Sequence, residues 1–529
     1  MARLTRLMTV AVVGSLFAAG CGSSGTATPE AGIDELISGE GPGTGTGVIG
    51  DDPSGGAADG GTSVGPSGAA GDGTGAGVAP GGDPDGSAAG SQPGSGASGA
   101  GTGTTGGGSG TGTGPSGGGT TTTPVADDDL VMGRGVTADT ITIGFQAGET
   151  GAAFAAVGAA LAPAYENEMA AALVDWLNAT GGIRGRQVEG VYHETETTQG
   201  TFASQAQAVC STMAEDNETF VVISSAVGGD DSLASCLHDK QTPLVELNTW
   251  IWDEPQLRGF PNLYRPGHFR AEEGYRAYLE GLAALGFFEG ATVGLLRFDA
   301  PVFDRIMEGV VEPTTQRLGV EYVEQVISSP GGVSDFGGAG AEMANAVVRF
   351  RAAGVTHVVM IENAGIMPFF FLKEAESQGF RPRYGFSTID IPQTQASQGD
   401  PNQLRGALAI GWAPPIDVNG DDVPSPNAAF QLCDQILEDA GVENRAGFYA
   451  QSRCDAVFML RAALERAPAL TADGLRAGVE SLGTSHQSPF TWRAEYGPDK
   501  HWAAASVAPL AYLDECECFR YTGGPYRVS

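Results

Sequence analysis

The feature that most constrains this chain is an alternation of short apolar runs with longer helical patterns. Residues 140–145 are mostly β-branched, and residues 220–223 form a continuously apolar run. An unbroken apolar strand is typical of a parallel sheet that helices cover on both faces. The alternation therefore predicts an α/β fold. Its expected strands are 140–145, 186–192, 220–223, 243–247, 292–296, 320–327 and 356–361.

The alternation stops near Tyr264-Arg265-Pro266 and starts again at about Ala271, so we expect two α/β lobes in series. Apolar side chains at helical spacing, such as those of Phe202, Ala206 and Val209, place helices between the strands. The expected helices are one that breaks near Pro163 and ends at about Leu177, then 202–213, 231–240, 271–285, 303–318, 342–353, 367–377, 427–440, 451–466 and 472–482, and two strand-like pieces follow at 490–496 and 507–513.

Residues 22–124 have a different composition, which is dominated by Gly, Ser, Thr, Ala and Pro and contains no basic residue. Such a segment cannot bury enough apolar surface to offset the entropy of ordering its backbone. We expect a disordered tether whose root-mean-square span is roughly 50–60 Å.

The N-terminus has the pattern of a signal peptide. Arg3 and Arg6 supply positive charge, and residues 7–19 form an apolar run. That run is shorter than the roughly 20 apolar residues of a membrane-spanning helix. Ala18-Ala19-Gly20-Cys21 resembles the lipobox of bacterial lipoproteins, in which a diacylglycerol is attached to the cysteine. We therefore expect an exported protein that is lipid-anchored through Cys21 to the outer face of the cytoplasmic membrane.

The other six cysteines predict disulfide bonds, because an exported chain meets an oxidising environment. Cys210 and Cys236 lie on the expected helices that flank one strand, and such helices are neighbours in a right-handed parallel unit. Proximity in the sequence favours the pairs Cys210–Cys236, Cys433–Cys454 and Cys516–Cys518.

Composition and motifs argue against several functions. The chain has 63 acidic and 28 basic residues and no basic stripe, so nucleic acid is not an expected partner. Residues 61–65 (Gly-Thr-Ser-Val-Gly) match a hydrolase nucleophile motif, but they lie in the tether without a flanking strand or helix. The histidines lack metal-ligand spacing, and no phosphate-binding loop occurs. We expect no catalytic residues, no cofactor and no metal.

Four segments carry a family resemblance through their order and spacing. They are residues 135–144 (GVTADTITIG), 179–186 (ATGGIRGR), 291–296 (ATVGLL) and 371–380 (FLKEAESQGF). Together they resemble the leucine/isoleucine/valine-binding family of substrate-binding proteins of ABC transporters, which has the type 1 periplasmic-binding fold. The C-terminal Cys516-Glu517-Cys518-Phe519 is similar to actinobacterial lipoprotein members.

The resemblance implies two doubly wound lobes that are joined by a three-stranded hinge and close on a small polar solute, such as an amino acid or an amide. A monomeric receptor of this kind delivers its solute to an ABC-type permease in the cytoplasmic membrane. The alternative is a ligand-sensing lipoprotein of the same fold that acts on a membrane sensor or a cell-wall enzyme. The expected parts are signal peptide 1–20, anchor and tether 21–134, lobe 1 at 135–268 and 416–490, and lobe 2 at 269–415 and 491–529.

The ligand site is expected in the loops beyond the carboxyl ends of the strands. Hydroxyl groups there suit a carboxylate, and an acidic residue opposite, Glu362 or Asp390, suits an ammonium group. Trp250 and Trp252 are bulky for this family and admit an aromatic or larger ligand. The candidate ligand-binding residues are Glu149, Thr150, Ser224, Ser225, Ala226, Asn248, Thr249, Trp250, Phe303, Asn363, Ala364 and Asp390.

Overall fold

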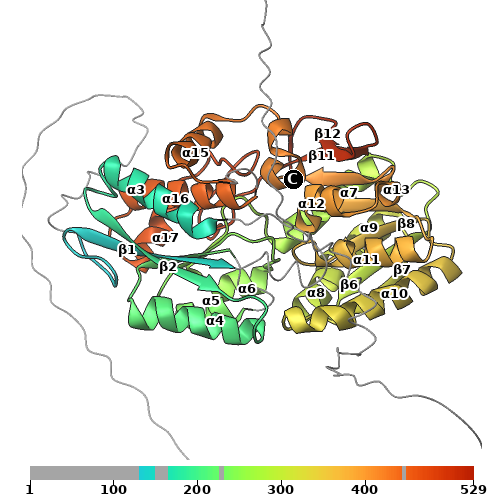
Figure 1. Ribbon diagram of the computed structural model, residues 1–529, viewed down its shortest axis with the longest axis horizontal. Helices are drawn as coiled ribbons and strands as arrows, with labels where there is room; N and C mark the ends of the chain where they lie inside the picture. Colours follow the sequence, from blue (N-terminus) through green and yellow to red (C-terminus); the bar gives the residue numbers. More distant parts are fainter. Residues whose placement is uncertain (1–129, 149–164, 226–230, 444–447, 529) are drawn as a thin grey trace, which may run out of the picture. The chain divides into compact units, whose positions relative to one another are not determined.

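The computed structural model describes residues 130–148, 165–225, 231–443 and 448–528. The expected signal peptide, Cys21, nearly all of the tether and the expected helix break near Pro163 lie outside these residues. The described chain forms two α/β lobes, each built on its own sheet (Figure 1). The fold class is the one that the sequence predicts.

The first lobe is built on a five-stranded parallel sheet with the order β2-β1-β3-β4-β5. Three later helices, α15 to α17, return to this lobe and pack in its core. Its strands are β1 (Thr140–Gly148), β2 (Gln187–Thr195), β3 (Val221–Ser224), β4 (Leu244–Glu246) and β5 (Leu263–Tyr264). Its helices are α3 (Glu166–Ala179), α4 (Phe202–Cys210) with a π-helical extension (Ser211–Asp216), α5 (Ser232–Asp239), α6 (Glu254–Gly259), α15 (Ala428–Asp439), α16 (Phe448–Arg466) and α17 (Ala472–Glu480).

The second lobe repeats this order in its parallel part, β7-β6-β8-β9-β10, and adds antiparallel strands at one edge. Its strands are β6 (Val293–Phe298), β7 (Tyr322–Ile327), β8 (His357–Ile361), β9 (Arg383–Ser387), β10 (Leu408–Gly411), β11 (Ser506–Leu513), β12 (Cys518–Tyr521) and β13 (Tyr526–Arg527). Its helices are α7 (Ala271–Ala284), α8 (Pro301–Ile306), α9 (Glu312–Leu318), α10 (Phe336–Ala352), α11 (Ile366–Ser377), α12 (Pro392–Gln398), α13 (Pro401–Leu404) and α14 (Pro414–Asp417), with a π-helical turn (Met307–Val311) and 3-10 turns at Val333–Asp335, Thr388–Asp390 and Gly420–Asp422.

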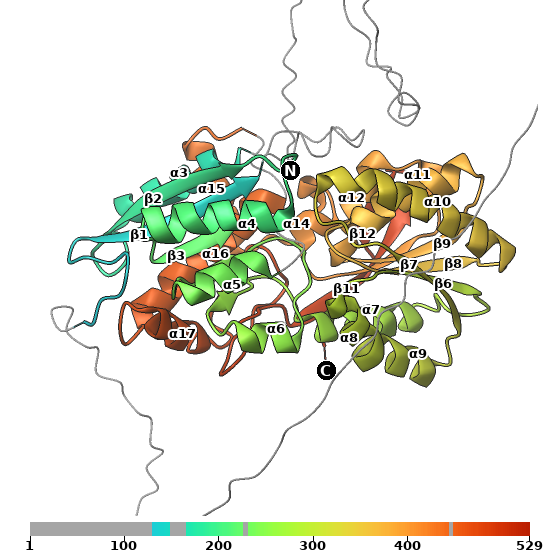
Figure 2. The same ribbon diagram turned by 90° about the horizontal axis from the view of Figure 1, so that it is seen from below.

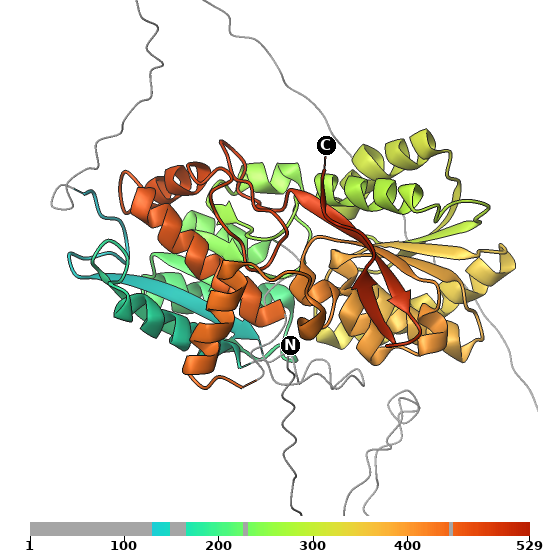
Figure 3. The same cartoon turned by 90° about the horizontal axis from the view of Figure 1, so that it is seen from above.

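Helices cover both faces of each sheet. In the first lobe α3, α16 and α17 lie over one face, and α4 and α5 lie over the other (Figures 1 and 3). In the second lobe α7 to α9 and α10 to α12 lie on opposite sides of the sheet (Figure 2). This double cover explains the continuously apolar strands, because both faces of β3 and β8 are removed from water.

Three segments connect the lobes: they run from β5 to α7, from α14 to α15, and from α17 to β11. They bond to one another near the ends of the sheets. The N–H of Arg265 donates to the carbonyl of His501 over 2.9 Å, and the N–H of Ala504 donates to the carbonyl of His268 over 2.9 Å. The polypeptide therefore crosses between the lobes three times, as the type 1 periplasmic-binding fold requires.

One local expectation is wrong, and one helix contains a feature that the sequence analysis did not predict. Residues 490–496 are not a strand, because they bond to a neighbouring crossing segment: the hydroxyl of Thr491 donates to the carbonyl of Trp412 over 2.7 Å. The expected helix 303–318 is confirmed and contains a π-helical turn before α9. Pro313 explains this turn, because its ring has no N–H to donate and crowds the preceding turn.

Three disulfides join the pairs that the sequence favours. Cys210–Cys236 connects α4 to α5, and Cys433–Cys454 connects α15 to α16, so both lie in the first lobe. Cys516–Cys518 spans the turn before β12 in the second lobe. The first two bonds each link two helices that pack on the same sheet.

Candidate ligand-binding site

The strand order places the switch point of each sheet between its first strand and its third. In the first lobe this point lies between β1 and β3, and in the second between β6 and β8. Ligands of doubly wound sheets bind beyond the carboxyl ends of the strands at such points. The loops that follow β3, β4, β8 and β9 are therefore the ones that matter for binding.

At the end of β3, Ser224 and Ser225 are buried and bonded. The hydroxyl of Ser224 donates to the side-chain oxygen of Gln146 over 2.7 Å, and the hydroxyl of Ser225 donates to the backbone carbonyl of Gln146 over 3.2 Å. The Ser225 hydroxyl also contacts the carboxylate of Glu166, which forms an ion pair with Arg453 over 2.5 Å. The switch point of the first lobe thus holds a buried ion pair.

A second buried ion pair lies at the end of β4. Nε of Arg265 lies 3.1 Å from the carboxylate of Glu246, and Nη2 of Arg265 donates to the carbonyl of Asn248 over 2.8 Å. Burial raises the pKa of the Glu246 carboxyl to about 7, although Arg265 acts in the opposite direction. Burial and the neighbouring Arg265 lower the pKa of His268 well below its ordinary value, so this histidine is neutral at pH 7. Arg265 therefore fixes the loop that presents Asn248, Thr249 and Trp250.

In the second lobe, the loop after β8 begins the helix α11. The carboxyl of buried Glu362 accepts bonds from the N–H groups of Gly365, Ile366 and Met367 over 2.8, 3.0 and 3.3 Å. Burial and the neighbouring Asp390 carboxyl raise the pKa of Glu362 well above its ordinary value. Glu362 is therefore a helix-capping carboxyl.

Two further carboxyls are buried nearby, after β9 and β10. Asp390 accepts bonds from the N–H and the hydroxyl of Ser387 over 2.6 and 3.0 Å. Asp417 accepts bonds from Thr388 over 2.9 Å and from the phenol of Tyr521 over 2.5 Å. Burial raises the pKa of both carboxyls to about 7. Within the described ranges, neither these carboxyls nor Glu362 form an ion pair with an arginine or lysine.

A pocket lies where loops of both lobes meet. Trp250 and Ile251 reach it from the loop after β4, whereas Ile389 and Trp412 reach it from the second lobe. The ring of Trp412 packs edge-on against Phe269, and the ring nitrogen of Trp412 is buried without a hydrogen-bond partner. Its lining is completed by Thr249, Arg265, His268, Phe269, Arg270, Ala271 and Gly274. The lining combines apolar walls with a few polar groups, but the cavity of about 10 Å³ has room for no more than a water molecule in this structure.

Hydrogen bonds join the two lobes around this pocket. The side-chain oxygen of Asn363, in the second lobe, accepts a bond from the N–H of Ile251 over 2.9 Å. The N–H of Phe202, at the start of α4, donates to the carbonyl of Gly331 over 2.8 Å. The loops of the two lobes are therefore in direct contact.

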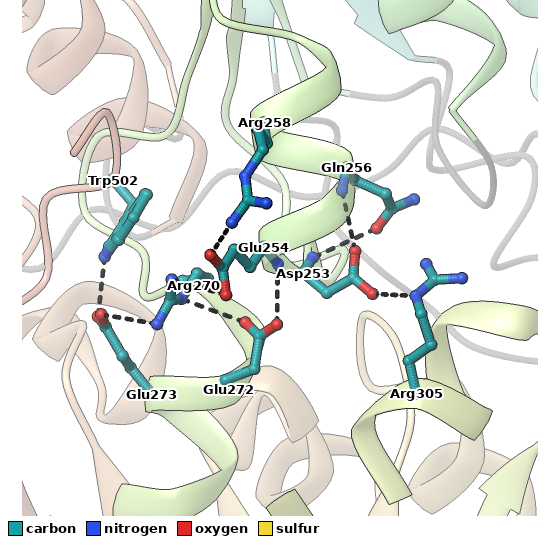
Figure 4. A network of polar contacts seen from close by, with 9 residues as sticks. All are labelled: Asp253, Glu254, Gln256, Arg258, Arg270, Glu272, Glu273, Arg305 and Trp502. Atoms are coloured by element: carbon teal, nitrogen blue, oxygen red, sulfur yellow. Dashed lines mark hydrogen bonds and ion pairs between the residues drawn. The ribbon is translucent and has the colours of Figure 1, made fainter. Parts of the chain in front are cut away.

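An ion pair adds to this contact (Figure 4). Asp253, which caps α6, lies with its carboxylate 2.5 Å from Nε of Arg305 on α8. The side chain of Asp253 is 1% exposed, whereas that of Arg305 is 42% exposed. Beside them, Arg270 lies 3.2 Å from Glu272 and 3.6 Å from Glu273 at the start of α7. The network thus connects α6, a crossing segment and α8.

The structure brings most of the predicted loop residues to this region but not all of them. Thr249 and Trp250 line the pocket, Asn363 bonds to the next residue of their loop, Ile251, and Ser224 and Ser225 lie at the switch point. Ala364 has a positive φ of 57° in the turn before α11. Phe303 lies away from the pocket, because it is fully buried against Phe298 in the core of the second lobe. Glu149, Thr150 and Ala226 lie outside the described residues.

Sequence reasoning missed several residues of this region, notably Glu166, Arg453, Ile389 and Trp412. One signal was present for Arg453, because a lone arginine on an otherwise buried helical face demands a partner. For Ile389 and Trp412 no local signal exists, since apolar residues after a strand are ordinary. The described residues contain no metal-binding cluster of His, Cys, Asp or Glu side chains. No helix in the described part of the chain is long and apolar enough to cross a membrane.

The fold is similar to solved binding proteins. A fatty acid ABC transporter substrate-binding protein from Thermomonospora curvata matches with a TM-score of 0.57 and 16% identity, covering 76% of this chain and 95% of that chain. A solute-binding protein from R. palustris in complex with 4-hydroxybenzoate matches with a TM-score of 0.56 and 16% identity, covering 74% and 98%. A leucine-binding protein from Thermotoga maritima matches with a TM-score of 0.53 and 13% identity, covering 73% and 99%. No curated protein matches the chain significantly.

A family model described as periplasmic binding protein matches residues 140–507. The match includes the strands β1 to β10 and the three crossing segments, so it covers both lobes. Proteins of this kind bind solutes and do not transform them, in agreement with the expectation of a non-enzymatic protein. The chain therefore belongs to the periplasmic binding protein family.

Proposed function

We propose that this protein captures a small solute between its two lobes and delivers it to an ABC importer in the cytoplasmic membrane. The contact between the loops of the two lobes carries the proposal, because the N–H of Ile251 in the first lobe donates to the side chain of Asn363 in the second, and Trp250 and Trp412 face the same small cavity. A ligand that contacts both lobes binds the closed form better than the open form and so shifts the balance toward closure.

The lining of the pocket favours a solute with an apolar or aromatic body. Trp250, Trp412, Phe269 and Ile389 offer large apolar surfaces, and Thr249 offers a hydroxyl. The similar solved structures include a substrate-binding protein of a fatty acid transporter, a complex with 4-hydroxybenzoate and a leucine-binding protein. The fold therefore accepts ligands whose apolar parts differ in shape. An amino acid, an amide or an aromatic acid with such a body is the class we propose, as the resemblance to the leucine/isoleucine/valine-binding family also implies.

The N-terminal part supplies the attachment in this proposal. Signal peptide 1–20 directs export, Cys21 carries the lipid, and the remainder of 21–134 tethers the lobes to the membrane. The receptor then samples solutes outside the membrane while it stays within reach of its permease. Replacing Cys21 by serine should release the protein from the membrane fraction of lipid-labelled cells and abolish the label.

Ligand screening by thermal unfolding tests the binding function. A ligand at 100 times its Kd stabilises the folded state by about 2.7 kcal/mol, which is a readily measured rise in Tm. We expect stabilisation by some of the amino acids, amides and aromatic acids, and weaker stabilisation of the Trp250→Ala variant. An unmoved Tm with every solute would contradict the proposal.

Uptake measurements separate import from sensing. Cells without the protein should lose uptake of the solute found in the screen, and the wild-type gene should restore it. Normal uptake together with a lost transcriptional or cell-wall response to the solute would favour the ligand-sensing alternative.

A further inference from the structure

We propose that Glu166, Arg453 and Ser225 form a head-group subsite that selects a ligand group of zero net charge with a hydrogen-bond donor beside an acceptor. Glu166 is the residue that sets this charge selectivity. The inference rests on the proposed function, because it specifies which solutes the protein takes.

The three side chains form a compact buried cluster. The carboxylate oxygen Oε2 of Glu166 accepts bonds from both partners: Nη2 of Arg453 lies 2.5 Å away, and the Ser225 hydroxyl also contacts it. Nη2 of Arg453 additionally donates to the Ser225 hydroxyl over 3.0 Å. The side chains of Arg453 and Glu166 are 0% and 2% exposed. One nitrogen of the arginine and one oxygen of the carboxylate therefore make all of these contacts.

The remaining polar atoms of the pair are buried and have no partner among the described residues. In residues 130–148, 165–225, 231–443 and 448–528, no acceptor takes a bond from Nε or Nη1 of Arg453, and no donor bonds to Oε1 of Glu166. A buried polar group without a partner destabilises the folded state, and the cost is larger when the group is charged. The cluster thus offers donors and an acceptor on adjacent side chains that no described residue satisfies.

The position of the cluster suits a ligand site. Ser225 directly follows β3, next to β1, at the switch point of the first sheet. Glu166 lies in the first turn of α3, and Arg453 lies in the first half of α16. α16 packs against α14, which belongs to the second lobe. The cluster therefore lies at the side of the first lobe that the ligand of a doubly wound sheet approaches.

The charge of the pair decides which head group fits. The pair carries one positive and one negative charge, so a bound anion or cation would leave one uncompensated charge in a buried site. A neutral group with an acceptor and a donor satisfies the arginine nitrogens and the Glu166 oxygen together. A carboxamide and the carboxylate–ammonium head of an amino acid share this chemistry.

Four probes with the same benzyl body test the selectivity in the full mature protein: phenylacetamide, phenylalanine, phenylacetate and phenethylamine. We expect calorimetry to show that at least one of the two neutral probes binds at least 10-fold tighter than the anion and the cation. A preference for phenylacetamide assigns the group as a carboxamide, and a preference for phenylalanine assigns it as an amino-acid head.

Charge variants test the assignment to Glu166. Glu166→Gln leaves the charge of Arg453 unopposed. It should therefore raise the affinity for phenylacetate, relative to the affinity for the neutral probes, by at least 10-fold. The double variant Glu166→Gln with Arg453→Gln again has no net charge at the subsite. It should therefore again bind the neutral probes more tightly than the anion and the cation. Glu168→Gln, on the exposed face of the same helix, is the matched control and should change nothing. Far-UV circular dichroism verifies that each variant is folded.

The results separate this inference from the proposed function. If the wild type prefers the anion, or if Glu166→Gln behaves like Glu168→Gln, the pair is structural and the subsite is wrong while solute binding stands. Binding of other solutes in the thermal screen but of none of the four probes also overturns the subsite. Failure of every solute to bind contradicts the proposed function itself.

Discussion

The two sheets have the same strand order, but the buried carboxyl groups at their carboxyl ends have different partners. At the first sheet, the buried carboxylates Glu166 and Glu246 each pair with an arginine. At the second sheet, Glu362, Asp390 and Asp417 are equally buried, yet their partners are backbone N–H groups, hydroxyls and a phenol. The difference shows that the strand order places polar side chains at the site without deciding their charge.

Each arrangement has its own consequence for stability. A buried ion pair depends on both partners, because the loss of one leaves an uncompensated charge. A buried carboxyl with a raised pKa depends instead on pH, because the folded state keeps a proton that the unfolded state releases. The first lobe should therefore be sensitive to mutation of its arginines. Carboxyl groups with a pKa raised to about 7 occur in both lobes, at Glu246 in the first and at Asp390 and Asp417 in the second, so both lobes contribute to the pH dependence of stability.

The largest effect should come from breaking a buried pair of the first lobe. Arg265→Met leaves the Glu246 carboxyl buried without its partner and should lower the free energy of unfolding by about 3–5 kcal/mol. Urea unfolding at pH 7 measures this. Arg258→Met removes an arginine whose side chain is 76% exposed and should cost less than about 1 kcal/mol. If both variants lowered the free energy of unfolding equally, the buried pair of Arg265 and Glu246 would stabilise the fold no more than an exposed pair does.

The disulfides provide the next largest difference between the lobes. The loop closed by Cys433–Cys454 spans 21 residues, whereas that of Cys516–Cys518 spans 2. In the chain-entropy account, a disulfide that closes a longer loop stabilises the folded state more. Replacing both Cys433 and Cys454 by alanine should lower the free energy of unfolding by about 3 kcal/mol, and replacing both Cys516 and Cys518 should lower it by about 1.5 kcal/mol. Urea unfolding compares the two double variants. The reverse order would indicate that strain or local packing dominates.

The pH dependence tests the second lobe. Burial raises the pKa of Asp417 from its ordinary range to about 7. Between about pH 4 and pH 7 the folded state binds more protons than the unfolded state, so stability falls as the pH rises, by up to about 1.4 kcal/mol per pH unit for this group.

Asp417→Asn should remove this share of the slope of unfolding free energy against pH, as urea titrations at pH 4.5, 5.5, and 6.5 would show. Asp421→Asn, on an exposed neighbouring turn, serves as the control. A slope that Asp417→Asn leaves unchanged would mean that the Asp417 carboxyl is ionised in the folded state.

The smallest effect concerns the contact between the lobes. Arg305→Ala removes the partner of Asp253 and should weaken solute binding by about 5-fold, or about 1 kcal/mol, because the closed form loses one ion pair. Calorimetry with the screened solute measures this, and the effect should shrink at high salt. Arg317→Ala breaks an ion pair within the second lobe and should leave affinity unchanged. Equal affinities of wild type and Arg305→Ala would show that the pair does not stabilise closure.

Much of the fold was predictable because its signals are local. Strand β3 is an unbroken apolar run, and α4 shows its buried face through Phe202, Ala206 and Val209. Strands β5 and β10 were not among the expected strands: β5 has only two residues, and β10 (Leu-Ala-Ile-Gly) contains only two large apolar side chains. The expected strand 490–496 failed because that segment bonds to Trp412, which lies 79 residues away from Thr491 in the sequence.

By itself the sequence determined the α/β class, the repeated strand–helix order, the three cysteine pairs and the loops where the polar residues would lie. Tertiary structure alone decided which residues face one another. Arg453 and Glu166 are 287 residues apart, and Asp253 and Arg305 are 52 apart and lie on different lobes. The physical reason is that periodicity reports whether a side chain is buried, whereas the partner of a buried charge is fixed by how distant elements pack.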